Sequence, residues 1–322
     1  MKVAHWVMKN QSGMHRMAEE ISACEATMGI TSVCLDGEIP VEIQAGLDAD
    51  IHVIHTRLPD VISPRKARVV WVAHGTPEVM FTNSVTEGTR QIHGSPDYWM
   101  QAHHWIRSAD AIVTFWDRHG WIWKQMADKN TRVDVVPMGV NMALWGAVTS
   151  RGKFVGSPSI LTGENCFSCK WPLDLFFAMP DVYEAMPLAR LHVFNMPQDQ
   201  CPWWYPLIYS NGAAYRSYIA VTRFAPPDLK NAFASVDYYA GLVRYGDHNR
   251  VMLEAKACGL PVISYRGNPY ADYWVDEGDQ RAIAAQLAMI LKGQVPPRED
   301  ITPVPDITAT ASAMAAIYGR IL

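Results

Sequence analysis

The sequence predicts an α/β protein with parallel, doubly wound sheets. Short apolar runs of strand length alternate with longer stretches that have helical periodicity, and strands that alternate with helices usually pair in parallel. The alternation continues through both halves of the 322-residue chain, which is long enough for two domains. We therefore predict two domains, each with a parallel sheet.

Candidate strands and helices follow one another from the start of the chain to its end. The stretch 146–158 is rich in small residues and weakly periodic, so it is the best candidate for a linker. The predicted strands are 2–7, 31–35, 51–56, 68–74, 111–116 and 133–138 in the first half, and 159–163, 190–196, 218–224, 236–243 and 261–265 in the second. The clearest predicted helices are 14–29, 98–109, 251–259 and 307–322.

Composition narrows the classes of function. The net charge is −4, so no global basic field favours nucleic acid or an anionic membrane. Hydrophobic residues make up 49% of the chain and charged residues 19%, which fits a soluble protein, and no segment has the roughly 20 apolar residues of a spanning helix. Six cysteines are too few for a disulfide framework. We expect a cytoplasmic protein without integral membrane association, or one in the host cytoplasm if it is viral.

The most informative segment is 237–263, DYYAGLVRYGDHNRVMLEAKACGLPVI. An apolar strand leads into a polar loop, and a helix begins directly after the loop. Unpaired amides of the first helical turn point at whatever occupies such a loop, which makes it an anion-binding site. Glu254 lies about one turn into the helix, within reach of sugar hydroxyls beside a bound phosphate.

This segment resembles, without gaps, the nucleotide-sugar signature of the retaining GT-B glycosyltransferases, the large mannosyl- and glucosyltransferase-like group. The first glutamate of the family pattern is Gly246 in this chain, and Asp247 is the acidic neighbour. The residues that match the pattern are Asp237, Arg244, Tyr245, Leu253, Glu254, Ala255, Ala257, Gly259, Pro261 and Val262.

Weaker matches in the family's order extend the resemblance over most of the chain. They are IHVIHT, VVWVAHGTP, ADAIVTFWDRHGWIWKQM and RVDVVPMGVNMALW. The resemblance implies the GT-B fold, with two Rossmann-like domains facing a cleft and a C-terminal helix that crosses back to the first domain. We expect an N-terminal acceptor domain at 1–148 together with 306–322, and a nucleotide-sugar domain at 149–305.

In the family, the glutamate that Glu254 matches accepts hydrogen bonds from the ribose hydroxyls of the nucleotide. The alternative is a solvated carboxylate on the helix surface. Amides near Val251 are expected to meet the diphosphate. Arg244, Asp247 and His248 lie in the loop above the carboxyl edge of the sheet, where ligands bind in open α/β folds. Asp247 is a candidate for holding the donor sugar, or alternatively it caps the following helix.

Lys170 matches the lysine of the family's Arg-x-x-x-x-Lys motif, whereas Asn165 stands at the arginine. A lysine there neutralises charge on the departing diphosphate, so Lys170 is assigned to both catalysis and donor binding. The alternative is an ordinary surface lysine.

Two residues of the first domain complete the predicted site. Gly13 follows the first strand, where a glycine lets the backbone approach a phosphate or sugar closely. His74 follows the strand 68–74 and is expected to hydrogen-bond the donor sugar or to stabilise charge near its anomeric carbon. A lone histidine in such a place is often structural.

No metal site is predicted. Cys166 and Cys169 form one CxxC without a second pair, and the DAD at 48–50 precedes a strand instead of ending one. The resemblance likewise implies no cofactor, because the nucleotide-diphosphate sugar is itself the donor substrate.

The sequence therefore indicates a metal-independent hexosyl- or pentosyltransferase. It would move a sugar from a nucleotide-diphosphate donor to the hydroxyl of a saccharide or glycoconjugate, with retention at the anomeric carbon. One alternative is a phage-type DNA glycosyltransferase that acts on a hydroxymethylated base, and the acidic net charge stands against it. Another is a sugar-nucleotide binding module that Gly246 and Asn165 have impaired, and a third is a GT-B epimerase. The sequence leaves the oligomeric state open.

Overall fold

A computed structural model describes residues 1–7, 13–56, 67–75, 103–146, 154–163, 173–194, 219–222, 226–243 and 249–322. The chain divides into two compact units. Unit 1 contains Met1–Asn141 and Pro305–Leu322, and unit 2 contains Met142–Val304. The sequence-based boundary at 148 lies a few residues beyond the point where unit 2 begins. Each unit has a six-stranded sheet in which all the described strand pairs are parallel.

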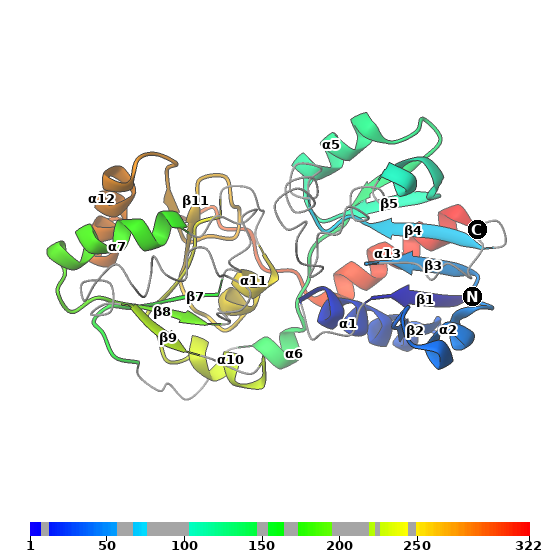
Figure 1. Ribbon diagram of the computed structural model, residues 1–322, viewed down its shortest axis with the longest axis horizontal. Coiled ribbons are helices and arrows are strands. Elements are labelled where there is room, and N and C mark those ends of the chain that lie inside the picture. Colours follow the sequence, from blue (N-terminus) through cyan, green and yellow to red (C-terminus); the bar gives the residue numbers. More distant parts are fainter. Residues whose placement is uncertain are drawn as a thin grey trace. The chain divides into compact units, whose positions relative to one another are not determined.

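The sheet of unit 1 has the strand order β2-β1-β3-β4-β5-β6 (Figure 1). Its strands are β1 (Lys2–Trp6), β2 (Thr31–Leu35), β3 (Ile51–Ile54), β4 (Arg68–Val72), β5 (Ala111–Thr114) and β6 (Arg132–Val135). The central strands are short apolar runs that are buried along their length, as expected for a parallel sheet covered on both faces.

Helices cover this sheet on both sides. They are α1 (Gly13–Thr27), α2 (Pro40–Gly46), α5 (Asp117–Met126) and α13 (Ile307–Ile321), and residues 103–108 are also helical. One face packs Val3, Val53 and Val70 against apolar side chains of α1 and α13. The other face packs Trp6, Trp71 and Trp123.

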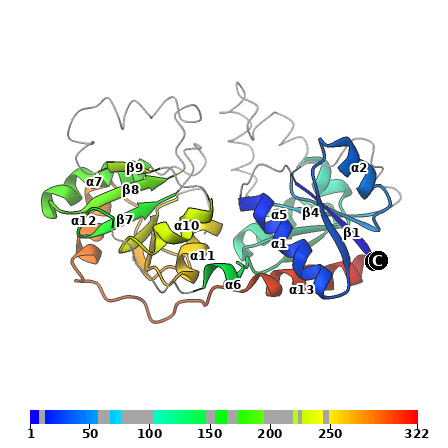
Figure 2. The same ribbon diagram turned by 90° about the horizontal axis from the view of Figure 1, so that it is seen from below.

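The C-terminal helix belongs to unit 1, which confirms the expected return of this helix to the first domain. Helices α1 and α13 lie side by side (Figure 2). Asp306 caps α13, with its side chain accepting from the amide of Thr308 at 2.9 Å. Thr310 Oγ1 accepts from the amide of Gly139 at 2.9 Å and donates to the carbonyl of Pro137 at 2.7 Å. A backbone bridge between Val140 and Asp306 completes this junction.

The backbone at Gly139 lies very close to the backbone at the start of α13. A Cβ there would lie 2.4 Å from the carbonyl oxygen of Asp306 and 2.7 Å from Cα of Ile307, both of which are backbone atoms. We expect Gly139→Ala to push α13 away and to cost about 1–3 kcal/mol, the usual range for overpacking. Urea unfolding measures this loss. Gly319→Ala, in α13 itself and with nothing within 4 Å of the new Cβ, is the control and should not destabilise.

The sheet of unit 2 has the strand order β12-β11-β10-β7-β8-β9. Its strands are β7 (Ser159–Thr162), β8 (Arg190–Phe194), β9 (Ile219–Thr222), β10 (Tyr238–Gly241), β11 (Val262–Tyr265) and β12 (Tyr273–Val275). Its helices are α6 (Met142–Trp145), α7 (Leu173–Ala185), α10 (Pro226–Phe233), α11 (Arg250–Ala257) and α12 (Gln280–Leu291). Helices α7 and α12 lie side by side over one face of the sheet (Figure 1).

None of the helices in the described part of the chain combines the length and the hydropathy that crossing a bilayer requires.

Candidate functional site

The order of the strands marks one point in each sheet where ligands are expected. In unit 2 the chain continues from β7 to β8 on one side and from β10 to β11 on the other, so the strand order reverses between β7 and β10. In unit 1 it reverses in the same way between β1 and β3. In open parallel sheets, ligands bind outside the carboxyl ends of the strands at such a switch point. Most of the predicted site residues that the structure describes lie at these two edges.

Helix α11 begins beyond the carboxyl end of β10. Its N-cap is Asn249, whose Oδ1 accepts from the amide of Met252 at 2.8 Å. The N-cap is therefore Asn249 and not Asp247, which was the alternative role for Asp247. Asp247 itself lies outside the described residues. Val251 is in the first turn, as predicted, where helix amides have no partner within the helix.

Glu254 is fully buried, so the alternative of a solvated surface carboxylate is wrong. Its Oε1 accepts from Nε of Arg250, one turn earlier in α11, at 2.9 Å. The Arg250 side chain is only 6% exposed, so the carboxylate has a buried counter-charge. Sequence reasoning missed Arg250, although the spacing of four residues between an arginine and a glutamate is a helical pairing signal.

A buried polar chain supports the sheet edge beside α11. Asn268, in the loop after β11, donates from Nδ2 to Oγ of Ser264 at 3.0 Å and contacts Sδ of Met252 in α11. Oγ of Ser264 in turn donates to the carbonyl of Gly241, the last residue of β10. The polar chain therefore ties the ends of β10 and β11 to the start of α11, which fixes the backbone on which a ligand would rest.

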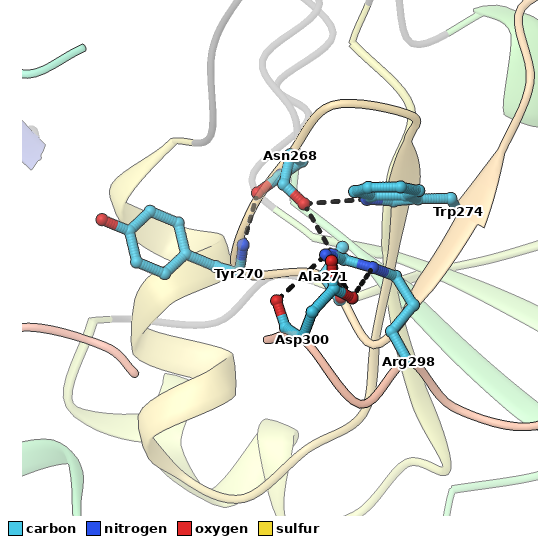
Figure 3. Close-up of polar contacts among 6 residues, drawn as sticks. All are labelled: Asn268, Tyr270, Ala271, Trp274, Arg298 and Asp300. Carbon is cyan, nitrogen blue, oxygen red and sulfur yellow. Dashed lines mark hydrogen bonds and ion pairs between the residues drawn. The ribbon is translucent and has the colours of Figure 1, made fainter. Parts of the chain in front are cut away.

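The backbone of the loop that carries Asn268 is held by Trp274 and Arg298, as Figure 3 shows. The carbonyl of Asn268 accepts from Nε1 of Trp274 at 2.8 Å and from a guanidinium nitrogen of Arg298 at 3.1 Å. The Arg298 guanidinium lies 3.5 Å from the centre of the Trp274 ring, a cation–π contact. None of these three residues was singled out from the sequence, because their contacts follow no helix or strand spacing.

In unit 1, Gly13 is the first residue of α1, and His74 lies just past the end of β4. Gly75, which follows His74, is held in place because Nε1 of the buried Trp123 donates to its carbonyl at 3.0 Å. Two of the predicted site residues therefore lie at the carboxyl edge of the first sheet, as expected.

His74 is the outer member of a row of hydrogen-bonded side chains. Its Nε2 lies 3.1 Å from Nδ1 of His55, and Nε2 of His55 lies 3.1 Å from Nδ1 of His5. Nε2 of His5 lies 2.9 Å from Oε2 of Glu25 in α1. His5 lies in β1, and the other two histidines follow β3 and β4, so the row crosses three neighbouring strands.

The inner end of the row is a buried carboxylate. Oε1 of Glu25 accepts from the Tyr318 hydroxyl of α13 at 2.8 Å, and Oε2 also accepts from Oγ of Ser32 at 2.6 Å. Burial raises the pKa of Glu25, but the attraction of His5 and the hydrogen bonds outweigh it and leave the pKa below its usual value. Burial and Glu25 together raise the pKa of Tyr318 well above its usual value.

The two outer histidines are neutral at physiological pH. Burial lowers the pKa of His74 to about 3. Burial, followed by the charges of His74 and His5, lowers the pKa of His55 well below its usual value. Neither ring therefore carries a positive charge at pH 7, although each holds one proton on one nitrogen.

Several predicted residues cannot be placed. Lys170, Arg244 and His248 lie outside the described residues, as do Asn165, Gly246, Cys166 and Cys169. Within the described residues, no group of three or more His, Cys, Asp or Glu side chains is arranged to hold a metal ion. Of the DAD, Asp48 pairs with the Lys2 ammonium group and Asp50 accepts from the backbone amide of Lys2, so both carboxylates join β1 to the segment before β3.

No protein-family model matches the sequence, and no curated protein matches it either. Solved structures do match its fold. Sucrose-phosphate synthase from Thermosynechococcus elongatus has a TM-score of 0.77 at 13% identity, covering 100% of this chain and 99% of that chain. HepE from Anabaena in complex with UDP-glucose has a TM-score of 0.66 at 13% identity, covering 100% and 98%. A glycosyltransferase from Rickettsia africae has a TM-score of 0.67 at 14% identity, covering 99% and 98%.

These likenesses extend over nearly the whole of each chain and include both parallel sheets and the returning C-terminal helix. The protein therefore has the GT-B fold of the glycosyltransferases.

Proposed function

We propose that the protein is a glycosyltransferase that moves a sugar from a nucleotide-diphosphate donor to an acceptor hydroxyl. The observation that carries the proposal is the end-to-end GT-B likeness to sugar-transferring proteins, one of them in complex with UDP-glucose. Glu254 supports it, because a buried carboxylate at the switch point of the second sheet is placed where nucleotides bind in such folds.

Unit 2 would bind the nucleotide. The amides near Val251 and the side chain of Lys170 would meet the diphosphate, and the Glu254 carboxylate would accept from the ribose hydroxyls. Arg244, Asp247 and His248 would surround the donor sugar. Unit 1 would contribute Gly13 and His74. The diphosphate would leave on the face where the acceptor enters and take the acceptor's proton, so the anomeric configuration is retained without a protein nucleophile.

The first test is thermal stabilisation by UDP, UDP-glucose and other nucleotide sugars. A ligand present at 100 times its Kd should stabilise the folded protein by about 2.7 kcal/mol. Glu254→Gln keeps an oxygen for Arg250 but loses the charge, so it should lose most of this shift and should lower the unliganded melting temperature less than Glu254→Ala does. Glu277→Gln, an exposed glutamate of the same unit, is the control. An undiminished shift in Glu254→Gln would show that the nucleotide binds elsewhere.

Turnover distinguishes the proposed enzyme from its alternatives. A transferase should release UDP from its donor and form a glycoside with the donor's anomeric configuration, which the anomeric proton coupling in an NMR spectrum reports. Donor binding without turnover, for every saccharide offered, would indicate a binding module. Conversion of the donor without any acceptor would indicate an epimerase.

A further inference from the structure

The row from Glu25 to His74 is a continuous chain of hydrogen bonds, in which the proton position on each ring depends on the next. The hydrogen bonds join Glu25 to Nε2 of His5, Nδ1 of His5 to Nε2 of His55, and Nδ1 of His55 to Nε2 of His74. His5 and His55 each use both ring nitrogens within the row, and His74 joins it through Nε2. The position of one proton therefore fixes the positions of all the others.

The row has two complete arrangements of protons. In the first, each ring carries its proton on Nε2 and donates inward, so Nδ1 of His74 is an acceptor. In the second, His5 carries protons on both nitrogens, each ring donates outward, and Nδ1 of His74 is a donor. His55 and His74 are neutral in both arrangements, which agrees with the lowered pKa values that burial gives them.

One proton converts the first arrangement into the second. It binds Nδ1 of His74 from water or a ligand hydroxyl, the Nε2 proton of His74 passes to Nδ1 of His55, and the Nε2 proton of His55 passes to Nδ1 of His5. The positive charge then lies on His5, 2.9 Å from the Glu25 carboxylate, where both side chains are fully buried. A buried imidazolium beside a carboxylate is far better stabilised than one beside an apolar wall.

We propose that Glu25, His5 and His55 are positioning residues that set whether Nδ1 of His74 accepts or donates a hydrogen bond, while the charge stays at the inner end of the row. Identifying the bound partner as a sugar hydroxyl rests on the proposed function, whereas the proton arrangement does not. Such a row would let His74 exchange a proton with a ligand without becoming charged beside it.

The neighbours of the row are consistent with this role. In the described part of the chain, the titratable groups hydrogen-bonded to the inner end of the row from the packed helices are Glu25 of α1 and, through it, Tyr318 of α13. The ring of the apolar Phe115 packs against His74. Cys24, next to Glu25 in α1, is itself influenced by the charges of Asp306, Glu20 and Glu25. Among the described residues, Glu25 is therefore the acidic group that directly contacts a ring of the row.

The test is the protonation of each ring in the full chain labelled with 15N-histidine, read from two-bond nitrogen–proton correlation spectra between pH 6 and 8.5. His55 and His74 should change tautomer together at one midpoint, with each ring moving its proton from Nε2 to Nδ1 and staying neutral. His52 is the internal control. It lies in β3, the strand that His55 follows, and its Nδ1 accepts from Trp6 Nε1 at 3.0 Å, so its proton should stay on Nε2.

Variants separate a proton-setting role from mere packing. Glu25→Gln removes the charge and should lower the common midpoint by about a pH unit or more. Tyr318→Phe keeps the charge and should preserve the concerted change. It is the variant to use if Glu25→Gln does not fold. A His74 tautomer that is constant with pH, or rings that titrate independently, would overturn the proposal. The spectra need no ligand, so the outcome is independent of whether UDP-glucose binds. Added UDP-glucose should perturb the His74 signals if the proposed function also holds.

Discussion

Acidification from pH 7 to pH 5 should destabilise the folded protein strongly, through histidines that are buried in the neutral form. Burial lowers the pKa of His52 to about 4 and that of His74 to about 3, and it lowers the pKa of His55 as well. Each of these folded-state values lies below the unfolded value of 6.5. The unfolded chain therefore binds more protons in this window, and stability is lost as the pH falls.

The expected loss is about 2 kcal/mol for each such ring between pH 7 and pH 5, because a one-unit pKa difference corresponds to about 1.4 kcal/mol. Glu25 does not contribute in this window. Its pKa is lowered from 4.5, so its share of the stability is present above that value and is lost only at lower pH.

Urea unfolding at the two pH values measures the effect. His52→Gln, which replaces a ring outside the row, should reduce the pH dependence by about one ring's share of about 2 kcal/mol. His104→Gln is the control, because that side chain is exposed. The interpretation fails if His52→Gln keeps the full dependence on pH.

Glu254→Ala should destabilise unit 2 by about 3–5 kcal/mol, the cost of removing one partner from a buried ion pair. Arg250 would be left with a buried guanidinium whose Nε has lost its carboxylate. The double variant Glu254→Ala/Arg250→Met also removes the buried positive charge and should recover much of the loss. Equal unfolding free energies for the wild type and Glu254→Ala would show that the pair is not buried in solution.

This second prediction also determines how the nucleotide site must be studied. A change at Glu254 alters the fold and the proposed ribose contact together, so alanine cannot separate them. The comparison between Glu254→Gln, which keeps an oxygen near Arg250, and Glu254→Ala provides that separation.

The fold was predictable because its signals are local. The run 31–35 is a strand with the same bounds in the structure, and most other runs were predicted one or two residues too long at their carboxyl ends. Strand β12 was missed, because Tyr273–Val275 is too short to give a periodic signal. The sequence shows that a histidine lies near the end of each of β1, β3 and β4. It does not show that the pairing of these strands brings the three rings into contact.

The site was predictable only in part. Glu254 could be found from its place in a strand–loop–helix segment, and its burial agrees with the importance given to it. Its partner Arg250 carries a helical pairing signal, the spacing of four residues to Glu254, but the sequence does not show that this pair is buried. The contacts of Asn268 with Trp274 and Arg298 join residues 6 and 30 positions apart, which no helix or strand spacing predicts.

The junction between Gly139 and α13 has a consequence for the order in which the chain acquires its structure during synthesis. Unit 1 is assembled from two stretches, and the second of them, Pro305–Leu322, leaves the ribosome after all of unit 2. Until Tyr318 emerges, Glu25 lacks its hydroxyl partner and the apolar face that α13 covers stays open to water. Unit 2 can thus finish folding first, and unit 1 is complete only after α13 has been synthesised.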